Sequence, residues 1–133
     1  RDDHARAAEL SRWRVMALID RIDTVFVPAI DTSTAAAWYG RMFGMTPIFE
    51  SAGYIGLRLP GGEAALTLYP ARSIDRDGHY RFNFYSSDPE GLRQAIVTEG
   101  LEATPIKDAG PIRYFDFRDI SGNWINICAP GRG

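Results

Sequence analysis

Alternating apolar and polar positions mark the last third of the chain. Over 112–118, Phe115 and Phe117 alternate with polar or mixed residues, and over 124–130, Ile125 and Ile127 do the same. A period of two is typical of half-buried strands. Asp, Ser, Gly and Asn occur between the two segments and favour a turn. The pattern predicts a β-hairpin with one apolar face and one mixed face that is free to line a site.

A strand followed by a helix and three strands is predicted for the first half. The β-branched segment 22–30 precedes Asp31, which can cap a helix over 32–43, and Gly44 can end that helix. Three short strands follow, over 46–51, 54–59 and 64–69. The order is therefore β-α-β-β-β, and the polar segment 71–78 is predicted to be a linker.

The same order returns after the linker. An alternating strand over 79–87 precedes Asp88, which caps a predicted helix over 89–99, and Gly100 ends it. A strand over 101–107 and the hairpin complete the second half. Asp31 aligns with Asp88 and Gly44 with Gly100, which indicates a duplicated unit of about fifty residues.

The predicted fold class is α+β, with two tandem β-α-β-β-β units forming a curved mixed sheet around a cleft and the helices outside. The units span 21–70 and 79–130 of a single domain, 21–133. Residues 1–20 have helix-forming composition, with Leu10, Trp13, Met16 and Ala17 near one stripe. The chain begins with Arg1, so 1–15 are either an extension foreign to the natural chain, which then starts at Met16, or part of a native docking or dimerisation helix.

Composition excludes several classes of protein. The 133 residues are 45% hydrophobic and 24% charged, with a net charge of −2, so the basic surface of a nucleic-acid-binding protein is missing. Cys128 is the single cysteine, which excludes an internal disulfide. No apolar run has the length of a membrane span, and no signal peptide is evident. A soluble, cytoplasmic protein without nucleic-acid or membrane partners is predicted.

Three features together resemble one superfamily. They are the duplicated unit, the segment DTSTAAAWYGRMFGM after the first strand and the hairpin YFDFRDISGNWINI. Over about 20–130 the chain resembles the vicinal oxygen chelate superfamily, which holds glyoxalase I, extradiol dioxygenases, fosfomycin-resistance enzymes and bleomycin-binding proteins. The resemblance implies the two-unit fold, but this fold hosts several chemistries.

The resemblance also implies where a metal would bind. The four ligand positions of metal-using relatives match Thr24, Thr67, Arg81 and Asn126. None is an imidazole or a carboxylate, which are the ligands that such metals prefer. A divalent ion about 4 Å from the Arg81 guanidinium would be opposed by roughly 8 kcal/mol at an effective dielectric of about 20. The sequence therefore predicts no metal and no cofactor.

Strand alternation, anchored on these positions, predicts which side chains line the cleft. The predicted ligand-binding residues are Thr24, Phe26, Arg58, Thr67, Tyr69, His79, Arg81, Asn83, Tyr114, Asp116, Trp124 and Asn126, and Tyr85 shares their face. Aromatic rings and guanidinium groups suit a planar aromatic or anionic ligand. Arg81 needs a partner, which is either Asp116, Tyr and Asn side chains, or a ligand anion.

Candidate catalytic groups are sparse. His79 is either a ligand contact or general base, or a histidine at a loop edge partly in solvent. Cys128 is either an inert thiol or a nucleophile. Two functions remain open: a metal-free protein that resembles the bleomycin-resistance branch and binds a small molecule, or a lyase, isomerase or dioxygenase of the superfamily with a non-standard site. Catalytic residues are not assigned, and a homodimer is predicted because a one-sided cleft exposes aromatic surface.

Overall fold

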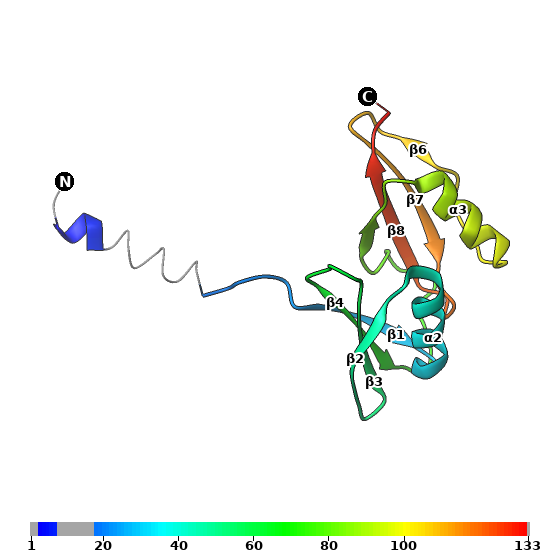
Figure 1. Cartoon of the computed structure of the whole chain (residues 1–133), viewed down its shortest axis with the longest axis horizontal. Coiled ribbons are helices and arrows are strands. Elements are labelled where there is room, and N and C mark those ends of the chain that lie inside the picture. Colours follow the sequence, from blue (N-terminus) through cyan, green and yellow to red (C-terminus); the bar gives the residue numbers. More distant parts are fainter. Residues whose placement is uncertain (1–2, 8–17, 133) are drawn as a thin grey trace.

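The chain forms two units of the same design, each a four-stranded sheet with one helix packed on it (Figure 1). The computed structural model describes residues 3–7 and 18–132. The first unit consists of β1 (Thr24–Ala29), α2 (Thr32–Phe43), β2 (Thr46–Ser51), β3 (Tyr54–Arg58) and β4 (Ala65–Pro70). The second consists of β5 (Asn83–Tyr85), α3 (Pro89–Thr98), β6 (Lys107–Asp108), β7 (Ile112–Arg118) and β8 (Trp124–Pro130).

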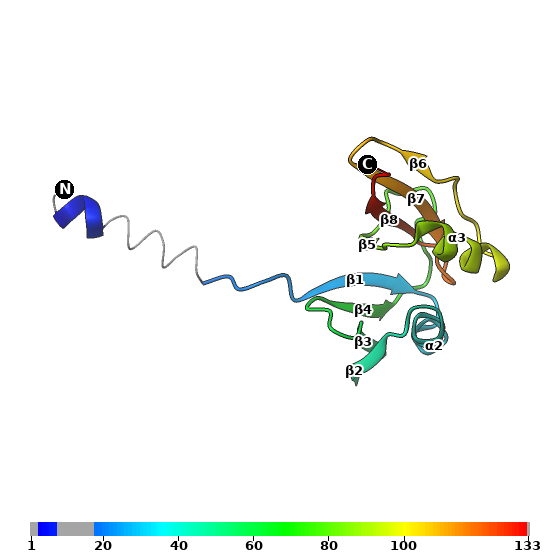
Figure 2. The same ribbon diagram turned by 45° about the horizontal axis from the view of Figure 1, so that its top comes forward.

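Strand order is the same in both sheets. The first sheet has the order β1-β4-β3-β2 and the second has β5-β8-β7-β6. The outer pairs β1–β4 and β5–β8 are parallel, and the remaining neighbours are antiparallel. This confirms the predicted α+β class with two tandem β-α-β-β-β units. The eight strands are hydrogen-bonded as two sheets, and the β1 edge of one faces the β5 edge of the other (Figure 2).

The helix boundaries follow from their caps. The Asp31 carboxylate accepts a hydrogen bond from the Thr34 amide at 3.0 Å, and the Asp88 carboxylate accepts one from the Gly91 amide at 3.1 Å. Each bond satisfies an amide that the first helical turn leaves free. Gly44 ends α2 in the left-handed region, with φ of 70°. The predicted helices over 32–43 and 89–99 therefore agree with α2 and α3 to within one residue.

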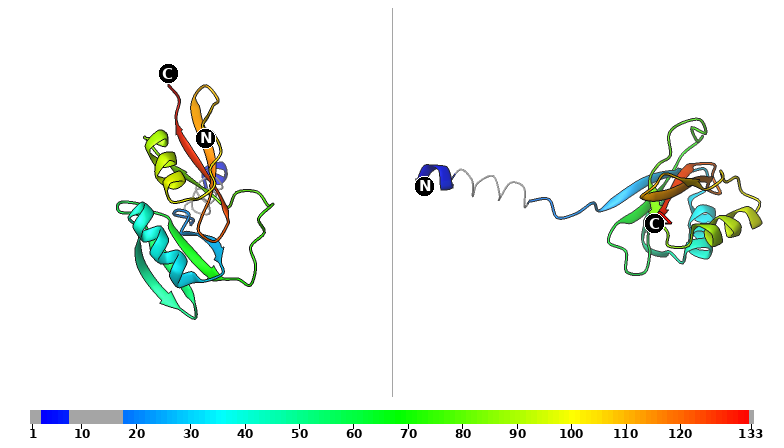
Figure 3. Two further views of the ribbon diagram at one scale, coloured as in Figure 1. Left: turned by 90° about the vertical axis from the view of Figure 1, so that its right-hand side faces the viewer. Right: turned by 90° about the horizontal axis from the view of Figure 1, so that it is seen from above.

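A single core lies between the sheets and the helices. Both helices are on the same side of the pair of sheets (Figures 1 and 3). Phe43, at the end of α2, contacts Phe84 and Phe117 of the second unit, with ring centroids 5.2 and 6.0 Å apart. Buried side chains of the two units thus form one cluster, because α2 packs against both. We call the opposite side of each sheet its open face.

Two strands of the second unit are shorter than predicted. β5 covers only 83–85 of the predicted 79–87. The Arg81 amide donates to the Trp124 carbonyl, and the Asn126 amide donates to the Phe82 carbonyl. In a regular parallel ladder the Asn126 amide would donate to the carbonyl of Arg81 itself. The shift to Phe82 shows that one extra residue interrupts the strand here.

The predicted strand over 101–107 is reduced to β6 and an isolated bridge between Ala103 and Phe117. Pro105 lies in this segment and lacks an amide hydrogen to donate to a ladder. The segment still follows β7, because the Thr104 amide donates to the Asp116 carbonyl and the Arg118 amide donates to the Glu102 carbonyl.

The predicted N-terminal helix over 1–20 lies mostly outside the described residues. Residues 3–7 are helical, and the segment before β1 exposes Leu18, Ile19 and Ile22. None of the described helices is long and apolar enough to cross a membrane.

An ion pair fixes the start of α3 to β7 and makes stability depend on pH. Arg113 donates to both carboxylate oxygens of Glu90, at 2.6 and 3.1 Å. This hydrogen bonding lowers the pKa of Glu90. A carboxyl whose pKa is lower in the folded chain than in the unfolded chain stabilises the fold at pH values above its unfolded pKa. That contribution is lost as the pH falls through the folded pKa. We expect the melting temperature of wild type to exceed that of Glu90→Gln at pH 7, with the difference shrinking on acidification to pH 3. A difference that does not change with pH would contradict this assignment.

Candidate ligand-binding face

The open face of the first sheet has a buried floor and exposed aromatic rings. On β1 and β4, Thr24 and Phe26 share this face with Thr67 and Tyr69, as predicted from strand alternation. The Thr24 and Thr67 hydroxyls are hydrogen-bonded at 2.7 Å. Thr67 is 2% exposed, whereas Phe26 is 59% exposed. The face therefore presents large apolar side chains to solvent above small polar ones.

Phe49 also lies on this face, although strand alternation does not predict it. Regular alternation from Thr46 would turn Phe49 toward the core, but an irregularity between Pro47 and Phe49 shifts the register of β2. Phe49 is consequently paired with Gly56 of β3. A side chain at Gly56 would collide with the Phe49 ring, so glycine permits the ring to approach the strand closely. The one sequence signal was Gly56 itself, since a glycine inside a strand often marks a close approach.

Arg58 lies on the same face, one row from Gly56. It is opposite Ala65 of β4 and Thr46 of β2. The residue is half-buried, and its Nε is buried with no hydrogen-bond partner among the described residues. At the other end of β3 and β4, the rings of Tyr54 and Tyr69 lie at a shallow angle of 30° with centroids 6.3 Å apart.

On the second sheet, three polar side chains cross the middle of the open face. Asn83, Asn126 and Asp116 are cross-strand neighbours on β5, β8 and β7. The Asn126 amide nitrogen donates to Asp116 Oδ1 at 2.8 Å, and Asn83 donates to Asn126 Oδ1 at 3.4 Å. The Asp116 backbone amide also donates to Thr104 Oγ1. Hydrogen bonds therefore join the three side chains into one row.

Aromatic residues lie on either side of this polar row. Tyr114 and Tyr85 flank Cys128 in the next row along the strands. In the row on the other side, the Arg118 guanidinium lies 4.0 Å from the centre of the Trp124 ring. Arg118 also donates to Glu102 at 2.6 Å. Trp124 is thus covered on one side by a cation that already has a carboxylate partner.

Arg81 is paired with an asparagine. Its Nε donates to Asn123 Oδ1 at 3.1 Å, so of the partners considered from the sequence the structure selects an Asn side chain. Asn123 is buried and also donates to the Pro28 carbonyl of β1, which links the two units. Among the hydrogen bonds and ion pairs of the described residues, Asp116 has no bond to Arg81. The extra residue before β5 accounts for this, because it takes Arg81 out of the regular ladder.

His79 lies in the loop before β5. It is exposed, and its ring contacts the Tyr80 ring at a tilt of 48° with centroids 3.8 Å apart. Its Nδ1 is 3.1 Å from the Tyr80 carbonyl oxygen. The structure therefore places it at the loop edge, in accord with the simpler of the two interpretations.

The four positions implied for metal ligands do not fit a divalent metal. Thr24 and Thr67 bond to each other, Arg81 is a cation, and Asn126 bonds to Asp116. Within 3–7 and 18–132, no group of three or more His, Cys, Asp or Glu side chains could hold a metal ion. Neutral hydroxyl and amide oxygens are poor ligands for zinc or manganese, and a guanidinium cannot act as a ligand because it has no lone pair to offer.

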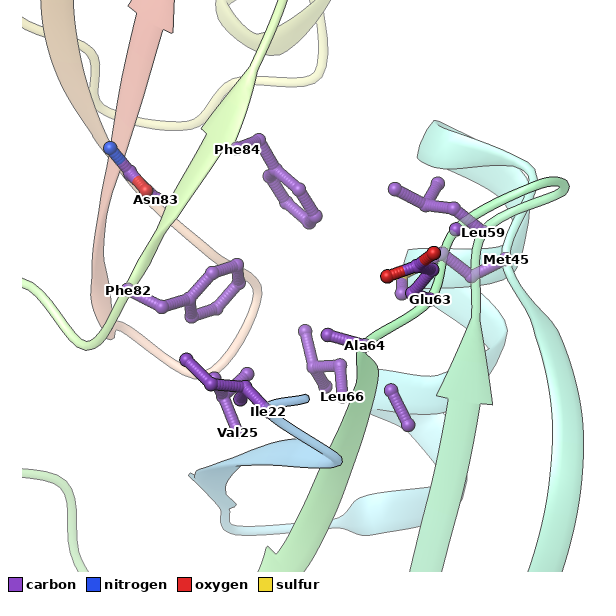
Figure 4. A pocket seen from close by; sticks show the side chains of 12 residues that line it. Ile22, Val25, Met45, Leu59, Glu63, Ala64, Leu66, Phe82, Asn83 and Phe84 are labelled. Atoms are coloured by element: carbon purple, nitrogen blue, oxygen red, sulfur yellow. The ribbon is translucent and has the colours of Figure 1, made fainter. Parts of the chain in front are cut away.

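A cavity of about 410 Å³ lies at the seam between the units and borders the open face at Ala65 (Figure 4). Its lining is mainly apolar and consists of Ile22, Val25, Met45, Leu59, Gly62, Glu63, Ala64, Ala65, Leu66, Phe82, Asn83 and Phe84. Phe82 and Phe84 face Leu59 and Met45 across it (Figure 4). Of the predicted site residues, only Asn83 lines this seam cavity. Sequence alternation could not indicate it, because it arises where two units meet.

Comparison with known proteins gives the family. Residues 21–127 match the model of the Glyoxalase/Bleomycin resistance protein/Dioxygenase superfamily. The chain belongs to this superfamily, which confirms the resemblance seen in its sequence. A search of curated proteins found no match.

Solved structures share the fold at low identity. TnmS3, an antibiotic binding protein from a Streptomyces species, is 18% identical, with a TM-score of 0.70 over 85% of this chain and 98% of that one. The fosfomycin resistance protein FosX from Listeria monocytogenes, complexed with Mn(II) and sulfate, is 15% identical, with a TM-score of 0.71 over 86% and 93%. A superfamily member from Sphaerobacter thermophilus is 16% identical, with a TM-score of 0.73 over 84% and 98%. At these identities the likeness concerns the fold alone.

Proposed function

We propose that this protein binds a small planar aromatic molecule on the open face of the first sheet, without a metal. The observation that supports this best is the contrast between buried floor and exposed rings. Phe26 and Phe49 are largely exposed above Thr67, Ala65 and Gly56, which are buried. Exposed aromatic side chains gathered on one face commonly mark a binding surface.

Two further observations support the proposal. The four positions implied for metal ligands contain no imidazole or carboxylate, which favours binding over metal-assisted chemistry. A structural neighbour, TnmS3, is an antibiotic binding protein, which makes a similar role reasonable for this chain. A homodimer is part of the proposal, because a second copy could close the open side of this face over a bound ligand. A cytoplasmic location is also part of it. Light scattering that showed monomer alone at high micromolar concentration would contradict the dimer.

A thermal-shift screen of planar aromatic compounds tests the proposed site. We expect at least one compound to stabilise wild type, and Phe26→Ala to weaken its binding about 5- to 30-fold, because a ring that stacks on the ligand is lost. Ala64→Leu is the matched control, since Ala64 lines the seam cavity and not the open face. If Ala64→Leu weakens binding and Phe26→Ala does not, the ligand occupies the seam cavity and the proposed site is wrong.

The alternative function is an enzyme of the superfamily, a lyase, isomerase or dioxygenase, with a rebuilt site. Metal analysis of protein purified without chelator separates the two. The binding proposal predicts no bound metal. Near-stoichiometric zinc, iron, manganese or nickel would contradict it and favour the enzyme.

A further inference from the structure

Arg58 differs from every other arginine that is buried or half-buried among the described residues. Arg81, Arg93, Arg113 and Arg118 each donate hydrogen bonds to an oxygen of the protein. Arg58 has no hydrogen bond and no carboxylate within ion-pair distance among the described residues, and its Nε is buried. A buried guanidinium nitrogen without a partner lowers stability unless something else supplies an acceptor.

Arg58 has small neighbours on the open face. Across the sheet, Ala65 separates Arg58 from Thr24, and a methyl group is all that Ala65 contributes to the face. The next row contains Gly56 and Thr67, bounded by the rings of Phe49 and Phe26. A low floor with a guanidinium at one end and aromatic rings beside it matches a flat molecule that has an anionic group at its edge.

We propose that Arg58 binds the anionic group of a planar aromatic acid, and that Arg81 is a structural residue. This inference rests on the proposed function and adds the charge of the ligand and the residue that recognises it. A guanidinium offers two parallel N–H groups to a carboxylate or sulfonate, which a neutral amide of the same shape cannot accept as well. Arg81 is already bonded to the buried Asn123, so it needs no ligand.

Isothermal titration with 2-naphthoate and 2-naphthamide tests this, using wild type, Arg58→Gln and Arg81→Gln. We expect wild type to bind the naphthoate at least about 10-fold more tightly than the amide, because charge-assisted hydrogen bonds are the stronger ones. Arg58→Gln should abolish that preference while the amide still binds. Arg81→Gln, the matched control, should retain it.

A second readout requires no ligand. The melting temperature of Arg58→Gln should lie within about 2 °C of that of wild type or above it, because the substitution removes an unpaired buried group. Arg81→Gln should melt at a lower temperature than wild type, because it loses the bond to Asn123. A clear fall in the melting temperature of Arg58→Gln would show a structural partner and overturn the proposal.

The binding outcomes separate the two proposals. If wild type binds both compounds equally and Phe26→Ala weakens both, the proposed function stands and the role of Arg58 is refuted. The same holds if the preference for naphthoate disappears in Arg81→Gln and survives in Arg58→Gln. If wild type binds neither compound, nor any in the planar aromatic screen, the proposed function fails and this inference fails with it.

Discussion

Asp119→Ala is expected to destabilise the protein by about 3–5 kcal/mol, which corresponds to a fall in melting temperature of roughly 12–20 °C. Asp119 lies in the turn between β7 and β8 and is 2% exposed. Its carboxylate accepts hydrogen bonds from the Tyr39 hydroxyl at 2.6 Å and from the amides of Ser121 and Asn123 at 2.9 Å. The Asn123 side chain donates a fourth bond, at 3.0 Å.

These bonds join the two units as well as forming the turn. Tyr39 belongs to α2 of the first unit, and Asn123 also donates to the Pro28 carbonyl of β1. Burial raises the pKa of Tyr39, and the Asp119 carboxylate raises it further, so the hydroxyl remains a donor. Alanine at position 119 would remove the acceptor of all four bonds, and the buried Tyr39 hydroxyl and Asn123 amide would lose the partner that each has here.

Tyr39→Phe is the matched control. It removes one donor and leaves Asp119 with the other three, so we expect a loss of only about 1–2 kcal/mol. Urea denaturation of wild type and both variants measures the two differences. A loss below 1 kcal/mol for Asp119→Ala would show that the turn and the unit interface do not depend on this carboxylate.

Local patterns were sufficient for most of the fold. Helices α2 and α3 were predictable because an aspartate caps the start of each one, and the apolar pattern stops at the residue that ends it. The hairpin was predictable because Phe115, Phe117, Ile125 and Ile127 alternate with polar residues without interruption, and all four are buried. The internal duplication also predicted that the two units pack together, since one β-α-β-β-β unit cannot cover its own apolar surface.

The site was less predictable because it depends on departures from alternation. An irregularity in β2 brings Phe49 onto the open face, and an extra residue before β5 displaces Arg81. The partner of Arg81 is Asn123, which lies 42 positions away in the sequence. Whether an arginine is paired is a tertiary property, so the sequence could propose Arg58 and Arg81 as ligand contacts but could not distinguish them.

The assignment of core and open faces yields a second large effect. Phe117 on β7 is fully buried and contacts Phe43 of α2, whereas Tyr85 at the end of β5 is 70% exposed on the open face. Phe117→Ala should cost about 3–5 kcal/mol, because it removes a buried ring and leaves a cavity where the two units meet. Tyr85→Ala removes a ring of similar size, but the change in stability should stay within about 0.5 kcal/mol.

Urea denaturation of these two variants beside wild type measures the contrast. Circular dichroism at 20 °C first checks that each variant is folded before its midpoint is compared. Comparable losses for Phe117→Ala and Tyr85→Ala would mean that a partner buries Tyr85 in solution. The measurement on wild type is then repeated over a hundredfold range of protein concentration. A midpoint that rises with concentration identifies the partner as a second copy of the chain. A small loss for Phe117→Ala at every concentration would instead show that the core between the units is not where the structure places it.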